Sequence, residues 1–154
     1  MEGDMKERFD RFTNAIAAIY QDIRKIKQAE MSRYDLQSGH ADCLHLLLDH
    51  PEGLTSGELA EVSGMDKAAV SRYMKVLEER GYAVMEERDE KIYRRKWKLT
   101  KEGKQTARHI QRRIDAAVSA VGDFMNEKQR AQLYDVLEQI VANIDDYVGQ
   151  VNDR

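Results

Sequence analysis

A short segment near the middle of the chain carries side chains that can contact DNA. Ser71, Arg72 and Lys75 are spaced so that they fall on one side of a helix. Arginine can bind a guanine edge with two hydrogen bonds, serine can bond a base or a phosphate, and lysine suits phosphates. We therefore expect a recognition helix over 66–80 that enters the major groove. Its predicted DNA contacts are Lys67, Ala68, Ser71, Arg72 and Lys75. For any one of these residues alone, a solvated surface helix is the competing interpretation.

Two helices joined by a tight turn should position this outward face. Thr55 and Glu58 have the spacing of a capping box for a helix that begins at Ser56. Gly64 suits a turn residue with positive φ, and Asp66 can cap the helix that follows. Val70, Met74 and Leu77 form the inward stripe of that second helix. This order is typical of a helix-turn-helix.

A basic hairpin is expected directly after the two helices. Two strands, 82–86 and 92–99, flank a charged turn over 87–91. Its basic residues are Arg88, Lys91, Arg94, Arg95, Lys96 and Lys98. A protruding loop of this kind can place an arginine in the minor groove. We expect the wing, residues 87–95, to contact DNA through Arg88, Lys91 and Arg94, with Arg94 as the first choice. The alternative is an edge strand protected from aggregation by its charges.

The distribution of charge favours DNA more than the net charge does. The chain carries a formal charge of −3. Residues 67–104 hold 12 basic and 7 acidic side chains, whereas the rest of the chain holds 13 and 21. A basic middle between acidic flanks indicates a local phosphate-binding surface.

Long amphipathic helices are expected at both ends of the chain. The first should end before the breaker pair Ser38–Gly39, and a short buried helix over 41–49 should follow. The apolar stripes at the two ends are too extensive for one small domain to cover, and such patches normally mark an interface. We therefore expect a two-fold homodimer, which would place two recognition helices ~34–36 Å apart. Its predicted contacts are Phe9, Phe12, Ile16, Ile19, Leu133, Leu137, Ile140 and Ile144.

The composition and the motifs argue against a membrane protein, a secreted protein and an enzyme. The 154 residues include one proline and one cysteine, and no apolar run approaches the ~18 residues of a membrane span. The charged N-terminus lacks the apolar core of a signal peptide, so we expect a cytoplasmic protein that does not enter a membrane. We find no nucleophile elbow, phosphate loop or HExxH motif, and we expect neither an enzyme nor a cofactor.

Four segments together resemble the MarR family of bacterial and archaeal regulators. They are LTSGELA at 54–60, VSR at 70–72, LEERGY at 77–82 and LTKEG at 99–103. The resemblance implies a dimer built from the terminal helices, whose winged helix-turn-helix binds a pseudo-palindromic site. Family members usually carry Asp-x-Arg in the wing, but here Asp89 is followed by Glu90 and Lys91. The wing arginine is therefore either Arg88 or Arg94.

These observations predict a mainly α fold with a small β-hairpin wing. Residues 40–103 should form the winged helix-turn-helix, and 1–36 with 104–154 the helical dimerisation region, in one intertwined unit. The predicted function is that of a dimeric regulator of transcription, a repressor, that binds double-stranded DNA and is released by a small-molecule effector. The alternatives are a winged-helix protein-interaction module without DNA binding, and a zinc-responsive regulator of the same fold.

The zinc alternative depends on a partial resemblance to the zinc-sensing branch of the family. Its candidate ligands are Glu30, His40, Asp42, Cys43 and His109. They show no tight ligand spacing, and Cys43 among leucines is typical of a small core residue. We therefore expect no metal site.

Overall fold

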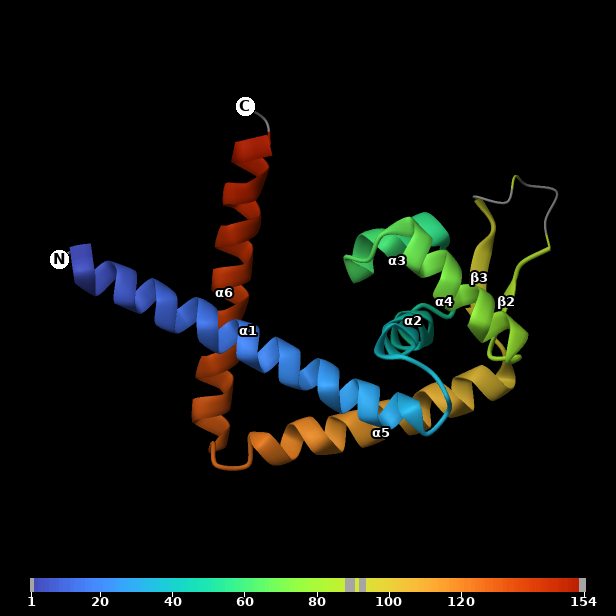
Figure 1. The fold of residues 1–154 in the computed structure, drawn as a ribbon, viewed down its shortest axis with the longest axis horizontal. Coiled ribbons are helices and arrows are strands. Elements are labelled where there is room, and N and C mark those ends of the chain that lie inside the picture. The colour runs from blue at the N-terminus through green and yellow to red at the C-terminus, as the bar shows by residue number, and fades with distance from the viewer. Residues whose placement is uncertain (1, 88–90, 92–93, 153–154) are drawn as a thin grey trace. The chain divides into compact units, whose positions relative to one another are not determined.

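The computed structural model describes residues 2–87, 91 and 94–152, and confirms the mainly α fold class. The chain divides into two compact units, 1–117 and 118–154. Figure 1 labels helices α1 to α6 and strands β2 and β3. Their bounds are α1 Glu2–Ser32, α2 Ser38–Asp49, β1 Leu54–Thr55, α3 Ser56–Ser63, α4 Lys67–Glu79, β2 Ala83–Met85, β3 Lys96–Leu99, α5 Lys101–Val121 and α6 Glu127–Asn152.

The first unit is built around a core to which α2, α3 and α4 all contribute. Val70, Met74 and Leu77 are completely buried, which confirms the predicted inward stripe of α4. Leu47 of α2 and Leu59 of α3 are buried in the same cluster. Burying a side chain of this size contributes about 1.5–3 kcal/mol, so this cluster holds the two helices of the helix-turn-helix at a fixed angle.

A three-stranded antiparallel sheet in the order β1-β3-β2 completes this unit. Leu54 pairs with Trp97 and Ala83 pairs with Leu99. Trp97 and Leu99 are buried, whereas Lys96 and Lys98 alternate with them and are half-buried. Strand β2 packs against α4 (Figure 1), so the start of the hairpin adjoins this helix.

The second strand of the hairpin is shorter than predicted. It begins at Lys96, and at Arg94 the chain turns, with the Arg94 N–H donating to the Lys91 carbonyl at 2.9 Å. The extended structure predicted for Arg94 is therefore wrong, because local turn hydrogen bonds replace the ladder there. Ile92 and Tyr93 lie outside the described residues. Strand β1, only two residues long, was not predicted from the sequence at all.

The first helix ends before Ser38–Gly39, as predicted, at Ser32. The pair itself does not break a helix, since Ser38 and Gly39 begin α2 three residues earlier than the predicted start at Ala41. The chain turns earlier, around Asp35, which has a positive φ of 54°. Gly39 is buried, and a Cβ there would lie 2.4 Å from the Tyr73 ring. The glycine therefore permits close packing of α2 on α4 and does not interrupt a helix.

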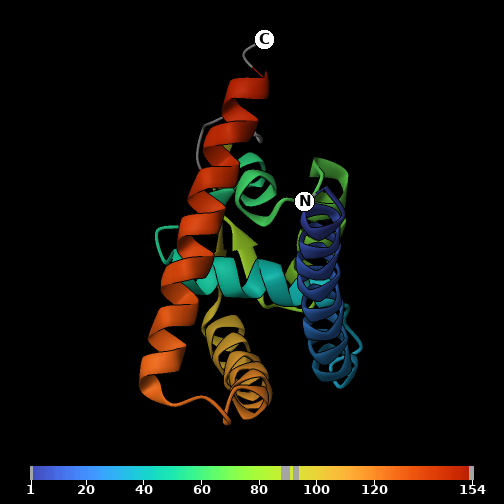
Figure 2. The same cartoon turned by 90° about the vertical axis from the view of Figure 1, so that its left-hand side faces the viewer.

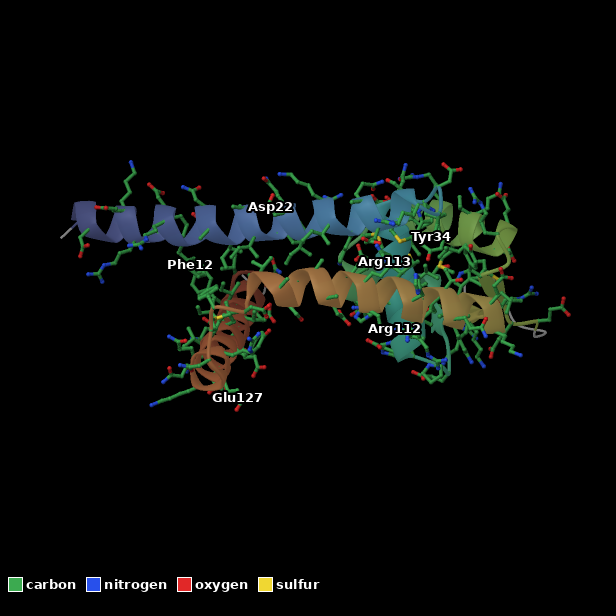
Figure 3. All side chains as sticks on the ribbon, turned by 90° about the horizontal axis from the view of Figure 1, so that it is seen from below. Phe12, Asp22, Tyr34, Arg112, Arg113 and Glu127 are labelled. Atoms are coloured by element: carbon green, nitrogen blue, oxygen red, sulfur yellow. The ribbon has the colours of Figure 1, made fainter. Side chains whose placement is uncertain are left out.

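Helix α5 packs its inner face on the same unit. Ala107, Ile110 and Ile114 are buried. The Arg113 guanidinium donates to the Glu30 carboxylate, with 2.5 Å between Nε and Oε2, and so joins α5 to α1. In Figure 3, Arg113 points toward the end of α1 near Tyr34, and Arg112 projects from the other side of α5.

The second unit consists of the end of α5, a turn and α6. Asn126 and Gln129 cap α6 reciprocally, with side chain to backbone distances of 2.9 and 3.0 Å. In this structure α6 has no buried residue. Figure 2 shows α1 and α6 each as a long, uninterrupted helix. Within the described residues, no helix is both long and apolar enough to cross a membrane.

Candidate nucleic-acid interface

The turn that presents α4 is built as the sequence predicted. The Thr55 hydroxyl accepts the Glu58 N–H at 3.2 Å, and the Glu58 carboxylate accepts the Thr55 N–H at 2.7 Å. Gly64 ends α3 with a φ of 69°. The Asp66 carboxylate then accepts the Ala69 N–H at 2.7 Å and begins α4. These local bonds fix where the first turn of α4 starts.

All five predicted contacts on α4 are exposed. They form the outward face, which consists of Lys67, Ala68, Ser71, Arg72 and Lys75. Small side chains stand near the start of the helix and basic ones flank them, so the backbone can approach a ligand closely. No hydrogen bond or ion pair holds the Lys67, Arg72 or Lys75 side chain within the described part of the chain.

A groove separates α4 from the hairpin. Its volume is about 370 Å³, and its lining includes Ser71 and Lys75 from α4 with Arg95 and Trp97 from the hairpin. Arg95 was counted in the basic run but was not predicted as a site residue. The signal that could have found it is its position two residues before the buried Trp97. The groove therefore brings together basic groups from two elements.

The basic side chains of the hairpin differ in how available they are to bind a phosphate. The Lys98 ammonium pairs with the Glu86 carboxylate at 2.5 Å, which neutralises it. Lys91 and Arg94, both predicted DNA contacts, are exposed. Arg88, the third predicted contact of the wing, lies outside the described residues.

The candidate zinc ligands do not come together. Among the described residues, no three His, Cys, Asp or Glu side chains are grouped to hold a metal. The hydrogen bond from Arg113 lowers the pKa of Glu30, and the Asp42 carboxylate pairs with Lys27 at 2.6 Å. His40 is buried, whereas His109 is exposed on α5. Two of the five candidates are thus committed to ion pairs.

Cys43 is a core residue. It is completely buried in the cluster that surrounds α2. Burial, with a smaller contribution from Asp42, raises the pKa of its thiol to about 12. A thiol in that state is a poor nucleophile at neutral pH.

The residues predicted to make the dimer carry exposed apolar surface. Phe9 is 66% exposed and Ile19 is 57% exposed on α1. On α6, Leu133 and Ile144 are exposed, whereas Leu137 and Ile140 are half-buried. Phe12 and Ile16 are exposed as well. A single copy of the chain thus leaves apolar stripes open to water in each unit.

A family model described as "MarR family" matches residues 34–92. This match spans α2, the helix-turn-helix and the first part of the hairpin. Over this segment the chain is similar to the MarR family. No curated protein matches the chain.

Solved MarR-family structures share the fold over most of the chain. A MarR transcriptional regulator from Methanosarcina mazei Go1 has 19% identity and a TM-score of 0.78, covering 87% of this chain and 96% of its own. A putative MarR family regulator from Listeria monocytogenes, complexed with 26mer DNA, has 21% identity and a TM-score of 0.77, with coverages of 88% and 91%. Staphylococcus aureus MarR, in complex with salicylate and kanamycin, has 16% identity and a TM-score of 0.78, with coverages of 92% and 95%. These similarities establish a MarR-type fold that includes the long helices.

Proposed function

We propose that this protein is a dimeric, DNA-binding regulator of transcription. It binds a pseudo-palindromic operator through the recognition helix over 66–80 and the wing over 87–95, and it acts as a repressor. The observation that carries the proposal is the exposed outward face of α4. Arg72 on that face is exposed and not engaged by any described residue, so its guanidinium is available to a base or a phosphate.

The groove beside α4 supports a second set of contacts. Lys75 and Ser71 line it from α4, and Arg95 lines it from the hairpin. A phosphate backbone that follows this groove meets two cations and the Ser71 hydroxyl, with the Glu78 carboxylate as the one acidic group of the described lining. Contacts of this kind fix the orientation of a protein on the duplex, while base contacts set the sequence. Arg95 therefore joins Lys91 and Arg94 in the proposed interface, together with Arg88.

The exposed stripes of α1 and α6 support a homodimer. Covering such side chains contributes about 1.5–3 kcal/mol each, which outweighs the effect of isolated surface charges. Two-fold pairing is the most frequent arrangement of identical subunits. The proposed interface residues are Phe9, Phe12, Ile16, Ile19, Leu133, Leu137, Ile140 and Ile144.

The similar proteins support the partners proposed here. The Listeria regulator was solved with DNA, and the Staphylococcus aureus MarR was solved with salicylate. We extend both properties to this chain, as a DNA-binding protein controlled by a small-molecule effector. A regulator of this kind acts where the chromosome is, so the proposal places it in the cytoplasm.

Selection of binding sites from random duplex DNA by the purified protein tests the function. We expect an enriched pseudo-palindrome whose half-sites are ~10–10.5 base pairs apart, bound as a dimer in sedimentation velocity runs. Affinity for it should fall ~10³–10⁵-fold between 50 and 200 mM salt if 6–10 phosphates are contacted. A monomer, or a protein that enriches no sequence and responds little to salt, would instead favour the protein-interaction module.

A further inference from the structure

Tyr73 joins α4 to the start of α2. Its ring lies edge to face with the His40 ring, at 4.7 Å between centroids and 69° between planes. The same ring fills the space beside Gly39, where a Cβ would lie 2.4 Å from it. Tyr73 directly follows Arg72, the residue of the outward face on which the proposed function depends. Two successive residues of α2 therefore hold the part of α4 that adjoins Arg72.

His40 also caps α2. It is the third residue of the helix, and its Nδ1 accepts the backbone N–H of the N-cap residue Gln37 at 2.9 Å. In a capping box this position is ordinarily occupied by Glu or Gln, whose side-chain oxygen accepts the same N–H. A ring nitrogen that accepts a hydrogen bond carries no proton, so the cap requires a neutral imidazole with its proton on Nε2. One side chain thus provides both the cap and the contact with Tyr73.

The surroundings of His40 oppose a positive charge on its ring. The side chain is only 5% exposed, and Nε2 has no hydrogen-bond partner among the described residues. Burial lowers the pKa of His40, the Gln37 backbone opposes this effect, and the charge of Arg80 adds to it. The ionisable side chains that share a hollow of about 470 Å³ with the ring are Asp35, Arg72, Tyr73 and Arg80. Since Arg80 already pairs with Asp35 at 3.1 Å, protonation of His40 places an uncompensated charge in a buried position.

We propose that His40 is a positioning residue for the recognition helix, and that its protonation in mild acid weakens binding to the operator. The neutral ring caps α2 and holds Tyr73, which keeps Arg72 in place on the outward face. A proton on Nδ1 opposes the Gln37 N–H, so the cap is lost. The protonated ring then donates to the Gln37 carbonyl, which lies 3.3 Å from Nδ1, and this exchange moves the ring against Tyr73.

The sign of the pH effect separates this inference from simple electrostatics. An added positive charge near Arg72 attracts phosphates, and by itself it would strengthen DNA binding in acid, most of all at low salt. Loss of the cap has the opposite effect, because it frees Tyr73 and with it the first turns of α4. The inference depends on the proposed function for this consequence, to which it adds regulation by pH.

His40→Gln is the informative variant, because glutamine is an ordinary capping-box residue at this position and does not titrate. We would measure operator affinity by fluorescence anisotropy between pH 7.5 and 5.0 at constant ionic strength. The wild type should lose about fivefold or more in affinity over this range. His40→Gln should retain most of the wild-type affinity at pH 7.5 and keep it in acid. His40→Ala, which has no acceptor for the Gln37 N–H, should bind weakly at both pH values.

Two exposed histidines provide matched controls. His45→Gln on α2 and His109→Gln on α5 each remove one imidazole and should leave the acid response of the wild type intact. A wild type whose affinity holds or rises as the pH falls would overturn the proposal. So would a His40→Gln variant that loses affinity in acid as the wild type does, or an acid response that disappears in either control. Circular dichroism at pH 5.0 should show native helix content, and global unfolding there would refute a local switch.

NMR of the DNA-free wild type tests the coupling independently of the operator and of any variant. The His40 ring, the Gln37 amide and the Tyr73 ring should titrate together, with one midpoint below pH 6.5. Signals of Gln37 and Tyr73 that ignore the His40 titration would overturn the coupling. If the three signals titrate together but no operator is bound at any pH, the regulator is refuted and the coupling stands. If the operator is bound equally well at every pH, the regulator stands and the switch is refuted.

Discussion

The Trp97 indole N–H donates a hydrogen bond of 3.0 Å to the Ser56 hydroxyl, across 41 residues of sequence. Ser56 is the first residue of α3 and Trp97 lies on β3, so the bond joins the helix-turn-helix to the hairpin. Trp97 also pairs with Leu54 in the neighbouring strand. The buried indole therefore helps to fix the position of the hairpin relative to α4, together with the packing of β2 on that helix.

Trp97→Phe should loosen the attachment of the hairpin to the helix-turn-helix without leaving a large cavity in the core. The phenyl ring fills much of the space but cannot donate to Ser56. We expect a loss of about 1 kcal/mol in the free energy of unfolding, typical of one hydrogen bond. Operator affinity should fall several-fold because the hairpin is held less firmly, as measured by fluorescence anisotropy with a labelled duplex.

Ser56→Ala is the matched control, since it removes the same bond from the other end. If the bond is the cause, the double variant should bind DNA no more weakly than the weaker single variant. Full additivity of the two losses would show that Trp97 and Ser56 act separately.

Alanine substitutions of Arg72 and Lys75 should have different effects on DNA binding, both in magnitude and in sequence dependence. Arg72→Ala should cost about 1–3 kcal/mol of operator binding and relax the sequence preference, if the guanidinium contacts a base. Lys75→Ala should weaken binding to all sequences about equally and reduce the salt dependence by about one phosphate contact. Binding curves over a range of salt, on the operator and on a scrambled duplex, separate the two. The placement of α4 is wrong if both variants bind both duplexes as the wild type does.

Cys43 should resist thiol reagents in the folded protein. Its thiol is buried and its pKa is raised to about 12, so the reactive thiolate is scarce at neutral pH. We expect negligible modification by iodoacetamide over hours, followed by full modification in denaturant, as read by mass spectrometry. Rapid alkylation of the native protein would reopen a redox role for this residue.

His40 should make the protein less stable in mild acid. Because its pKa is lowered from 6.5 in the folded state, the unfolded chain binds the extra proton first. Its contribution to stability is therefore present above pH 6.5 and is lost progressively as the pH falls below that value. Glu30 and Glu58, whose pKa values are lowered from 4.5, act in a more acidic range. Urea unfolding between pH 5 and 7.5 should show a slope that His40→Asn reduces. An unchanged slope in that variant would assign the effect to other groups.

Local patterns predicted the helix-turn-helix correctly. The capping pair Thr55 and Glu58, the turn at Gly64 and the cap at Asp66 each depend on residues no more than three apart. Such interactions are visible in a sequence because the partners are fixed by helical spacing. The exposure of the outward face of α4 followed from the same periodicity.

Features that depend on distant packing were not predictable in this way. In the sequence, Gly39 was interpreted as a helix breaker. In the structure, its lack of a side chain makes room for the ring of Tyr73, 34 residues later. Strand β1 is two residues long, too short for an alternating pattern, and exists because β3 pairs with it. Arg95 joins the groove beside α4 only because β3 lies there. Nothing in the sequence around His40 indicates that its Nε2 is buried without a hydrogen-bond partner among the described residues.

Crosslinking from α4 to DNA tests the central claim most directly. Ala68→Cys places a reactive thiol on the outward face while Cys43 stays buried, so a photoactivatable probe can be attached at one point per subunit. Gln105→Cys, exposed on α5, is the control. On the selected operator, the Ala68 probe should crosslink at two major-groove positions ~10–10.5 base pairs apart, and the Gln105 probe should crosslink little. Crosslinking from Ala68 at a single position, or no more than from Gln105, would contradict a dimer that binds DNA through α4.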